Sequence, residues 1–200
     1  MPLIAALLGA YLIGSFPTGF LLVKWLKRVD LRTVGSGNIG ATNVGRVAGR
    51  WASALVFVID AAKGALPVMI APVLLASPPP AAGLACGVAA VLGHNFPVFL
   101  KFKGGKGVAT TIGALLSAAP VAGLIYLVVW GAGLLISRYV SVSSMAAAAS
   151  IPVVLLILHR SSAELLLGFT LAFLIVLRHR ANIDRLRQGT EPRVGPGLTR

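Results

Sequence analysis

The longest uncharged run restricts the possible folds of this chain more than any other feature. From Gly107 to Ser137 the sequence contains no acidic or basic residue. As one straight helix the run would measure about 46 Å, whereas the apolar interior of a bilayer is about 30 Å thick. We therefore expect a break at Ser117–Pro120 and two short membrane spans, one on each side of it.

Composition also indicates an integral membrane protein. The chain is 57% hydrophobic and 12% charged, with a mean hydropathy of +0.90, which is more apolar surface than a soluble domain of this size can bury. The net charge of +13 indicates cytoplasmic loops, anionic lipids or anionic substrates, and not nucleic acid. Cys86 is the only cysteine, which excludes disulfides within the chain and cysteine-based metal sites.

Five further apolar segments complete the predicted topology: 3–23, 51–75, 81–99, 145–158 and 163–177. The basic groups at 24–50, 101–106, 138 and 178–193 should share one side. A chain that starts outside reaches the cytoplasm after one span and returns there after each of three further pairs of spans. We therefore expect an all-α membrane protein with seven transmembrane helices, the N-terminus outside, and the C-terminus and the polar loops in the cytoplasm.

Three details accompany this topology. The first segment lacks a basic start and a cleavage site, so we expect it to be retained as a span. His159-Arg160 is the one positive loop on the predicted outer side. We expect residues 1–200 to form a single domain, with a mobile end around Gly195–Gly197.

The first polar segment, Val34–Arg46, combines four glycines with Ser36, Asn38, Thr42 and Asn43. Glycines let a backbone turn tightly and bring its N–H groups close to a ligand, while hydroxyl, amide and guanidinium groups hold phosphate oxygens. The segment contains GxGxxG, but no βαβ unit surrounds it, so a dinucleotide site is not indicated. A flexible linker between two helices is the alternative.

The second polar segment, Lys101–Thr111, contains Gly104, Gly105, Lys106 and Gly107. It lacks the GxxxxGK[ST] pattern of a P-loop. Backbone N–H groups at a helix start, with ammonium groups beside them, can still bind an anion. The alternative is an ordinary positively charged cytoplasmic loop.

The third polar segment, 178–192, should continue the last span as a helix, with His179 and Asn182 on one face. His179 is either part of a functional site or an ordinary histidine at the membrane surface. Asp60 and Lys63 form a further pair, three residues apart inside the second span. They are either functional or a pair that neutralises itself.

The five carboxylates are scattered along the chain, so we expect no metal and no cofactor. A cationic, donor-rich site without metal is suited to holding more than one phosphate by direct contact.

At these residues the sequence resembles a known family. GSGNIGATN with its following arginine, GHNFPVFLKFKGGKGVAT and RHRANIDRLRQGTEP are together similar to the bacterial acyl-phosphate-dependent glycerol-3-phosphate acyltransferases, in order and over the whole chain. The resemblance implies a seven-helix enzyme of the bacterial inner membrane. It also implies transfer of a fatty acyl group from acyl phosphate to the 1-hydroxyl of glycerol 3-phosphate, the first step of phospholipid synthesis.

The resemblance also assigns residues and partners. It implies catalytic roles for Ser36, Arg46, Lys106, His179 and Asn182. It implies substrate binding by Asn38, Thr42, Asn43, Gly104, Gly105, Gly107, Ser143 and Ser144. Glu191 is expected to be structural. The implied partners are the two substrates, membrane lipid and the enzyme that makes acyl phosphate.

Three alternatives stay open at this point. Either His179 or the donor phosphate accepts the proton of the attacking hydroxyl. An acyl-enzyme on Ser36 would need a base beside that residue. A transporter of organic phosphates is the competing class, although we find no internal repeat and the polar segments are predicted at one face rather than at mid-membrane.

Overall fold

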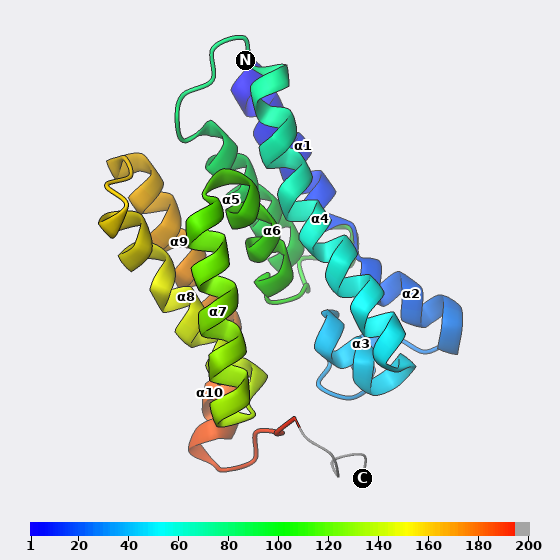
Figure 1. Ribbon diagram of the computed structural model, residues 1–200. Helices are drawn as coiled ribbons and strands as arrows, with labels where there is room; N and C mark the ends of the chain where they lie inside the picture. The colour runs from blue at the N-terminus through cyan, green and yellow to red at the C-terminus, as the bar shows by residue number, and fades with distance from the viewer. Residues whose placement is uncertain (195–200) are drawn as a thin grey trace. The chain divides into compact units, whose positions relative to one another are not determined.

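The structure is a computed structural model that describes residues 1–194. In these residues it contains ten α-helices, two 3-10 helices and no strand, which confirms the all-α prediction (Figure 1). The predicted mobile end at Gly195–Gly197 lies outside the described residues. The helices group into two compact units, Met1–Ala118 and a second that begins at Ala119. Each unit is described by itself.

The first unit contains six α-helices and both 3-10 helices of the described chain. They are α1 (Pro2–Ser15), α2 (Thr18–Lys27), η1 (Leu31–Thr33), α3 (Ala41–Ala48), α4 (Arg50–Leu74), α5 (Ala82–Asn95), η2 (Val98–Leu100) and α6 (Val108–Ala118). The start of α1 and the loop after α4 lie at the same end of this unit, where Met1–Leu3 line a hollow with Leu75–Ser77 (Figure 1). Helices α2 and α3 lie at its other end.

Glycines allow the long helices of this unit to pack closely. A Cβ added to Gly14 of α1 would overlap the Ala90 carbonyl of α5, and one on Gly93 of α5 would overlap the Tyr11 carbonyl of α1. Gly64 of α4 meets the Thr110 carbonyl of α6 in the same way. Small residues at such crossings are typical of helices packed in a membrane, where backbones approach each other directly.

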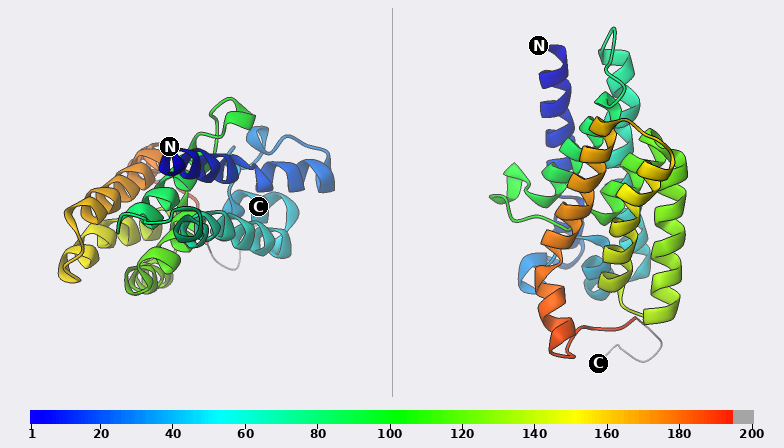
Figure 2. Two further views of the ribbon diagram at one scale, coloured as in Figure 1. Left: turned by 90° about the horizontal axis from the view of Figure 1, so that it is seen from above. Right: turned by 90° about the vertical axis from the view of Figure 1, so that its left-hand side faces the viewer.

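The second unit contains four helices in its described part: α7 (Pro120–Ser137), α8 (Val140–Ile157), α9 (Ser162–Arg178) and α10 (Arg180–Arg187). Helix α9 begins with a capping box between Ser161 and Glu164. The predicted continuous helix through residue 179 is wrong, because the chain bends by 53° between α9 and α10 (Figure 2). His179 stands at the bend with a non-helical backbone, φ −98° and ψ 6°.

The break predicted at Ser117–Pro120 is confirmed. Helix α1 ends just before Phe16-Pro17 and α2 begins at Thr18, while α6 ends at Ala118 and α7 begins at Pro120. Proline has no N–H to continue the helical hydrogen bonding, but it fits the first turn of a new helix.

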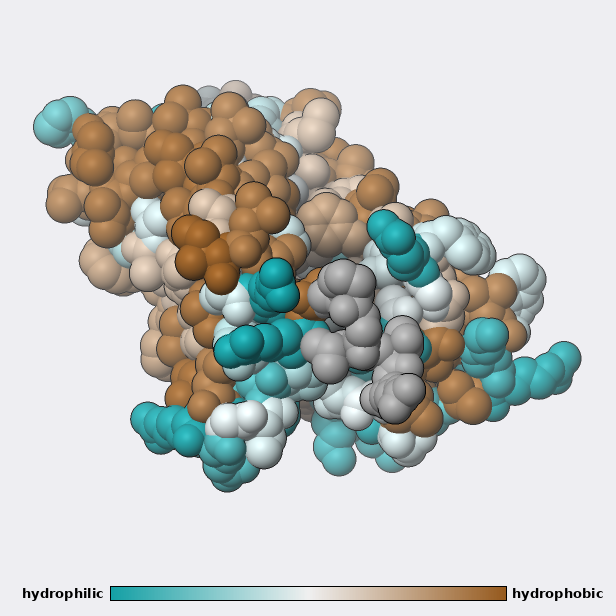
Figure 3. All heavy atoms as spheres, turned by 60° about the horizontal axis from the view of Figure 1, so that its bottom comes forward, coloured by the Kyte–Doolittle hydropathy of each residue, from teal (hydrophilic) through white to brown (hydrophobic). Residues whose placement is uncertain are grey.

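The outer surfaces of the helices are strongly apolar. Val73 of α4, Ile136 of α7 and Phe173 of α9 are 84%, 86% and 64% exposed, and apolar side chains dominate much of the surface in Figure 3. Within residues 1–194, five segments are long and apolar enough to cross a membrane, or six if α9 with α10 counts as one span. Surfaces of this kind are stable in lipid and not in water.

Helix α6 stands at the first of the two predicted short spans and is shorter than a bilayer is thick. Its 11 residues measure about 16 Å, roughly half of the apolar thickness of a bilayer. Thr110–Leu115 are buried within the protein, so most of α6 does not need lipid around it.

Candidate active site

Asn43 holds the first polar loop in shape from the first turn of α3. Its side chain is buried, and its Oδ1 accepts a hydrogen bond of 2.8 Å from the Ser36 N–H. Its Nδ2 donates to the Leu31, Val34 and Asn38 carbonyls at 2.9–3.3 Å. An amide offers only two N–H groups, so the one side chain closes the loop and keeps no donor for a ligand.

The loop has the sharp turns that its glycines predict. Gly35 and Gly37 have φ values of +59° and +69°, in the left-handed region that glycine adopts without a steric penalty. The Asn38 side chain closes a further turn by accepting a 2.8 Å hydrogen bond from the Gly40 N–H.

Ser36, Thr42 and Arg46 are the exposed polar side chains of this region. Thr42 and Arg46 lie four residues apart on α3 and therefore share one face of the helix. Within the described residues their side chains make no ion pair or hydrogen bond. The loop therefore presents a hydroxyl, a second hydroxyl and a guanidinium to solvent or to a ligand.

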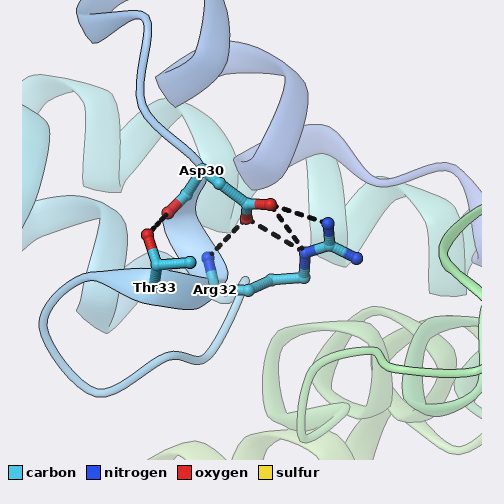
Figure 4. Close-up of polar contacts among 3 residues, drawn as sticks. All are labelled: Asp30, Arg32 and Thr33. Carbon is cyan, nitrogen blue, oxygen red and sulfur yellow. Dashed lines mark hydrogen bonds and ion pairs between the residues drawn. The ribbon is translucent and has the colours of Figure 1, made fainter.

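An ion pair fixes the entry to this loop (Figure 4). Asp30 accepts hydrogen bonds from the backbone N–H and the guanidinium of Arg32, the shortest being 2.7 Å, and its carbonyl accepts from Thr33. The side-chain and backbone hydrogen bonds from Arg32 lower the pKa of Asp30 to about 2. The carboxylate thus stays ionised throughout the neutral range, and η1 keeps its geometry.

The second polar loop is seated on the end of α5. The Gly105 N–H donates to the His94 carbonyl at 2.9 Å. A Cβ on Gly104 would overlap that carbonyl, and one on Gly105 would overlap the His94 ring. Gly107, with φ +77°, lies against the Asn95 side chain. The three glycines are buried and Lys106 between them is partly exposed at the start of α6.

A shared hydrophobic core connects the two loops. Leu100 of η2 packs in one cluster with Ile39 and Val44 of the first loop and with Val56 of α4. The structure therefore brings the first two predicted polar segments into one unit, on a common core. Their cationic groups, Arg46 and Lys106, are of the kind that binds anions.

His179 is buried at the bend of the second unit. Its Nδ1 lies 2.7 Å from the Ile175 carbonyl oxygen. A carbonyl can only accept, so Nδ1 carries a proton, and in the neutral ring Nε2 is the acceptor nitrogen. The Asn182 and Ile183 N–H groups donate to the His179 carbonyl and start α10. The histidine thus joins two helices by its backbone and its ring.

Glu191 connects three segments of the second unit. Its Oε1 accepts from Ser141 at 2.7 Å and from Asn182 at 2.6 Å, and its Oε2 accepts from Arg185 at 2.8 Å. Burial acts to raise the pKa of Glu191, but the hydrogen bonds from Asn182, Ser141 and Arg185 together lower it. The ionised carboxylate ties α10 to the start of α8. This geometry agrees with the structural role expected for Glu191.

Ser143 and Ser144 lie on α8 and not in a loop before it, because α8 begins five residues earlier than the predicted start at Met145. Both are fully buried. Their hydroxyls donate to carbonyls one turn back, Tyr139 and Val140, and Ser144 also accepts from the Trp130 ring. Such bonds satisfy serine inside a helix without breaking it.

The described residues contain no group of three histidine, cysteine, aspartate or glutamate side chains able to hold a metal ion. The candidate site residues are instead cations, hydroxyls, amides and backbone N–H groups. Groups of this kind bind phosphate and stabilise negative charge that develops on oxygen.

Sequence reasoning missed the residues that support the loops. It gave no role to His94, although the ring lies against Gly105, and none to Ser141 or Arg185, which hold Glu191. The sequence shows Gly105 and Glu191, but it does not show which side chains contact them in the folded chain.

Comparison with known proteins gives a consistent picture. The family model described as glycerol-3-phosphate acyltransferase matches residues 4–189. A glycerol-3-phosphate acyltransferase of Synechococcus elongatus is 42% identical over 205 aligned positions, covering 100% of this chain and 98% of the relative. One of Myxococcus xanthus is 48% identical and covers 94% of this chain and 98% of its own.

Two solved structures are also similar. The crystal structure of PlsY (YgiH), an integral membrane glycerol 3-phosphate acyltransferase, in its glycerol 3-phosphate form, superposes with a TM-score of 0.91 at 41% identity. That comparison covers 98% of this chain and 96% of the other. The lysophosphatidic acid form superposes with a TM-score of 0.88 at 37% identity, with the same coverage.

Proposed function

The chain belongs to the glycerol-3-phosphate acyltransferase family, and on that premise we propose that it transfers a fatty acyl group from acyl phosphate to the 1-hydroxyl of glycerol 3-phosphate. The products are 1-acyl-glycerol 3-phosphate (lysophosphatidate) and inorganic phosphate. One observation carries the proposal: two tight glycine-containing loops on a common core present Arg46 and Lys106. The PlsY relatives, solved in glycerol 3-phosphate and lysophosphatidic acid forms, support the same substrate and product.

The reaction needs alignment and charge neutralisation more than activation of the donor. The hydroxyl oxygen attacks the carbonyl carbon of acyl phosphate, a C–O bond to the glycerol forms, and the bond from that carbon to the phosphate oxygen breaks. Phosphate leaves with the electron pair and is a good leaving group. Holding the two reactants in position contributes up to about 7–11 kcal/mol to lowering the barrier.

The side chains divide these tasks. Arg46, Lys106, Ser36 and Thr42 bind the phosphate groups of the two substrates, and the Gly104–Gly107 backbone surrounds one of them. Asn38 and Asn43 act by shaping the first loop, because both amides bond to its backbone. An acyl-enzyme on Ser36 is not part of the proposal, since no described base contacts that hydroxyl.

His179 and Asn182 assist at the reacting hydroxyl, and Ser143 and Ser144 support the substrate side of α8. We propose that the donor phosphate accepts the proton and that His179 orients the hydroxyl. The departing phosphate gains negative charge as its bond breaks, so it becomes a better base at the moment the hydroxyl proton is released. No cofactor and no metal enter this scheme.

We propose further that the chain forms a single domain, lies in the bacterial inner membrane and crosses that membrane seven times. The five long spans, α9 with α10, and the short α6 make up this number. The N-terminus lies outside, and the loops at 35–46, 101–107 and 178–192 face the cytoplasm. There the acyl donor can arrive from the enzyme that makes it, while the product stays in membrane lipid.

Purified protein incubated with labelled glycerol 3-phosphate and acyl phosphate should form lysophosphatidate, and acyl-CoA should not replace the donor. The Lys106→Gln variant should raise the KM for glycerol 3-phosphate or abolish turnover. As a matched control, Lys103→Gln changes an exposed lysine on the same loop and should keep near-normal kinetics. Activity with acyl-CoA alone, or normal kinetics of a folded Lys106 variant, would contradict the assignment.

A further inference from the structure

Asp60 and Lys63 form a buried ion pair in the middle of α4. The Asp60 Oδ1 lies 2.6 Å from the Lys63 Nζ, and the side chains are 3% and 7% exposed. The Lys63 Nζ also donates a 2.7 Å hydrogen bond to the Phe16 carbonyl, at the break between α1 and α2. Charged groups at such a depth are costly in a membrane unless they are paired. Their retention therefore calls for a role beyond neutralising each other.

The second oxygen of the same carboxylate faces His94. The Asp60 Oδ2 lies 3.9 Å from the His94 Nδ1, and the histidine side chain is 6% exposed. The carboxylate therefore stands between an ammonium group on its own helix and an imidazole on α5. The middle of α4 is thus linked at one buried point to the break between α1 and α2 and to the last turn of α5.

His94 in turn carries the second polar loop. Its carbonyl accepts from the Gly105 N–H, and its ring fills the space where a side chain at Gly105 would lie. Asn95, fully buried, makes the same kind of contact with Gly107. Lys106 is thus held between two glycines that both rest on the last turn of α5. A rotation of the His94 ring would leave Gly105 without its support and would move Lys106.

We propose that Asp60 and Lys63 are positioning residues that act through His94. The ion pair fixes the His94 ring, the ring and its carbonyl fix the loop 104–107, and the loop fixes Lys106 for the phosphate of glycerol 3-phosphate. This inference rests on the proposed function, in which that loop binds this phosphate. It gives the intramembrane pair a specific role in affinity for one of the two substrates.

The double variant Asp60→Asn/Lys63→Met separates this role from simple neutralisation. It removes both charges together, keeps the approximate side-chain volumes and leaves no unpaired ion. A pair that only neutralises itself would make the double variant fold and react normally. We expect instead a folded protein whose KM for glycerol 3-phosphate rises about 10- to 100-fold, the size of loss seen when a metal ligand loses the residue that orients it, with the KM for the acyl donor unchanged. Normal kinetics in the double variant overturn the proposal.

A second pair of changes tests the ring contact directly. Gly105→Ala should raise the KM for glycerol 3-phosphate because its Cβ overlaps the His94 ring. His94→Ala removes the ring from the same contact and should raise this KM as well. The pair Arg160→Met/Glu164→Gln removes another ion pair and should leave this KM unchanged. If Gly105→Ala or His94→Ala leaves this KM unchanged, or if the control pair shifts the KM equally, the proposed path is wrong.

Binding measurements distinguish failure of this inference from failure of the proposed function. Glycerol 3-phosphate should raise the melting temperature of the wild-type protein in detergent, and much less that of the double variant and of His94→Gln, because a ligand stabilises only the form that binds it. A wild-type protein that binds glycerol 3-phosphate but does not use acyl phosphate contradicts the proposed donor alone. Equal stabilisation of wild type and variants contradicts the positioning role alone.

Discussion

At the scale of single residues, the proton on His179 decides what the histidine can do. Its Nδ1–H points to the Ile175 carbonyl, so proton acceptance would fall to Nε2. If His179 were the base, His179→Gln should lower kcat by about 10²–10⁴-fold and remove the acidic limb of the kcat–pH profile. We expect a smaller loss with the limb retained, because it then reports protonation of the substrate phosphate, near pH 6 in phosphate monoesters. A folded variant that binds both substrates and loses the limb would disprove this view.

Glu191 makes the stability of the second unit depend on pH. Its pKa in the folded protein lies below its ordinary value of 4.5, so the unfolded chain binds more protons in the acidic range. The stabilisation is complete above about pH 4.5 and is lost as the pH falls through the lower folded pKa. Glu191→Gln should cost about 1–3 kcal/mol at pH 7. Melting temperatures measured in detergent should converge for wild type and variant on acidification, and a constant gap would contradict this.

At the scale of elements, breaks encoded by proline could be predicted from the sequence, whereas breaks made by tertiary contacts could not. Pro120 marked the break between α6 and α7 because proline fits the first turn of a new helix, whereas Pro67 and Pro72 lie inside α4 and Pro152 inside α8. The bend at His179 has no proline or glycine to mark it, and the hydrogen bonds that hold α10 beyond it join Glu191 to Asn182 and Ser141, which are distant in the sequence. The hydrogen-bond donors of the first loop could likewise be identified from the sequence. The role of Asn43 in closing that loop could not, because its partners lie up to 12 residues away.

Helix packing in the first unit depends on glycines that the sequence alone does not distinguish. Gly9 and Gly93 both lie in long apolar helices, yet a Cβ on Gly9 meets open space and one on Gly93 overlaps the Tyr11 backbone. Gly93→Ala should therefore destabilise the protein by about 1–3 kcal/mol through overpacking. Gly9→Ala is the matched control and should be neutral or slightly stabilising, because alanine favours helix. Thermal unfolding in one detergent compares the two, and equal effects would refute the close α1–α5 contact.

At the scale of the whole molecule, charge gives the proposed topology its direction. The basic residues at the end of α2 and on the loop before α6 fall on one side when α4 and α5 both cross the membrane, as proposed. The exception, Arg160, is offset by its ion pair with Glu164 four residues on. That pair reduces the net charge of the loop between α8 and α9, so its place on the outer side does not conflict with the positive-inside rule.

Labelling of single cysteines in whole cells tests this topology in a background where Cys86, buried in α5, is replaced by alanine. Ser77→Cys, in the loop after α4, and Ser162→Cys, at the start of α9, should react with a membrane-impermeant maleimide applied outside. Lys103→Cys and Arg187→Cys should react only after the membrane is opened. All four positions are exposed, so a lack of labelling reports the side of the membrane and not burial. The decisive position is Ser162, because Lys103 and Ser162 lie on opposite sides only if α6, α7 and α8 cross the membrane an odd number of times. If α6 did not cross, the loop after α8 would be cytoplasmic, and Ser162→Cys would be protected from outside with six spans instead of seven.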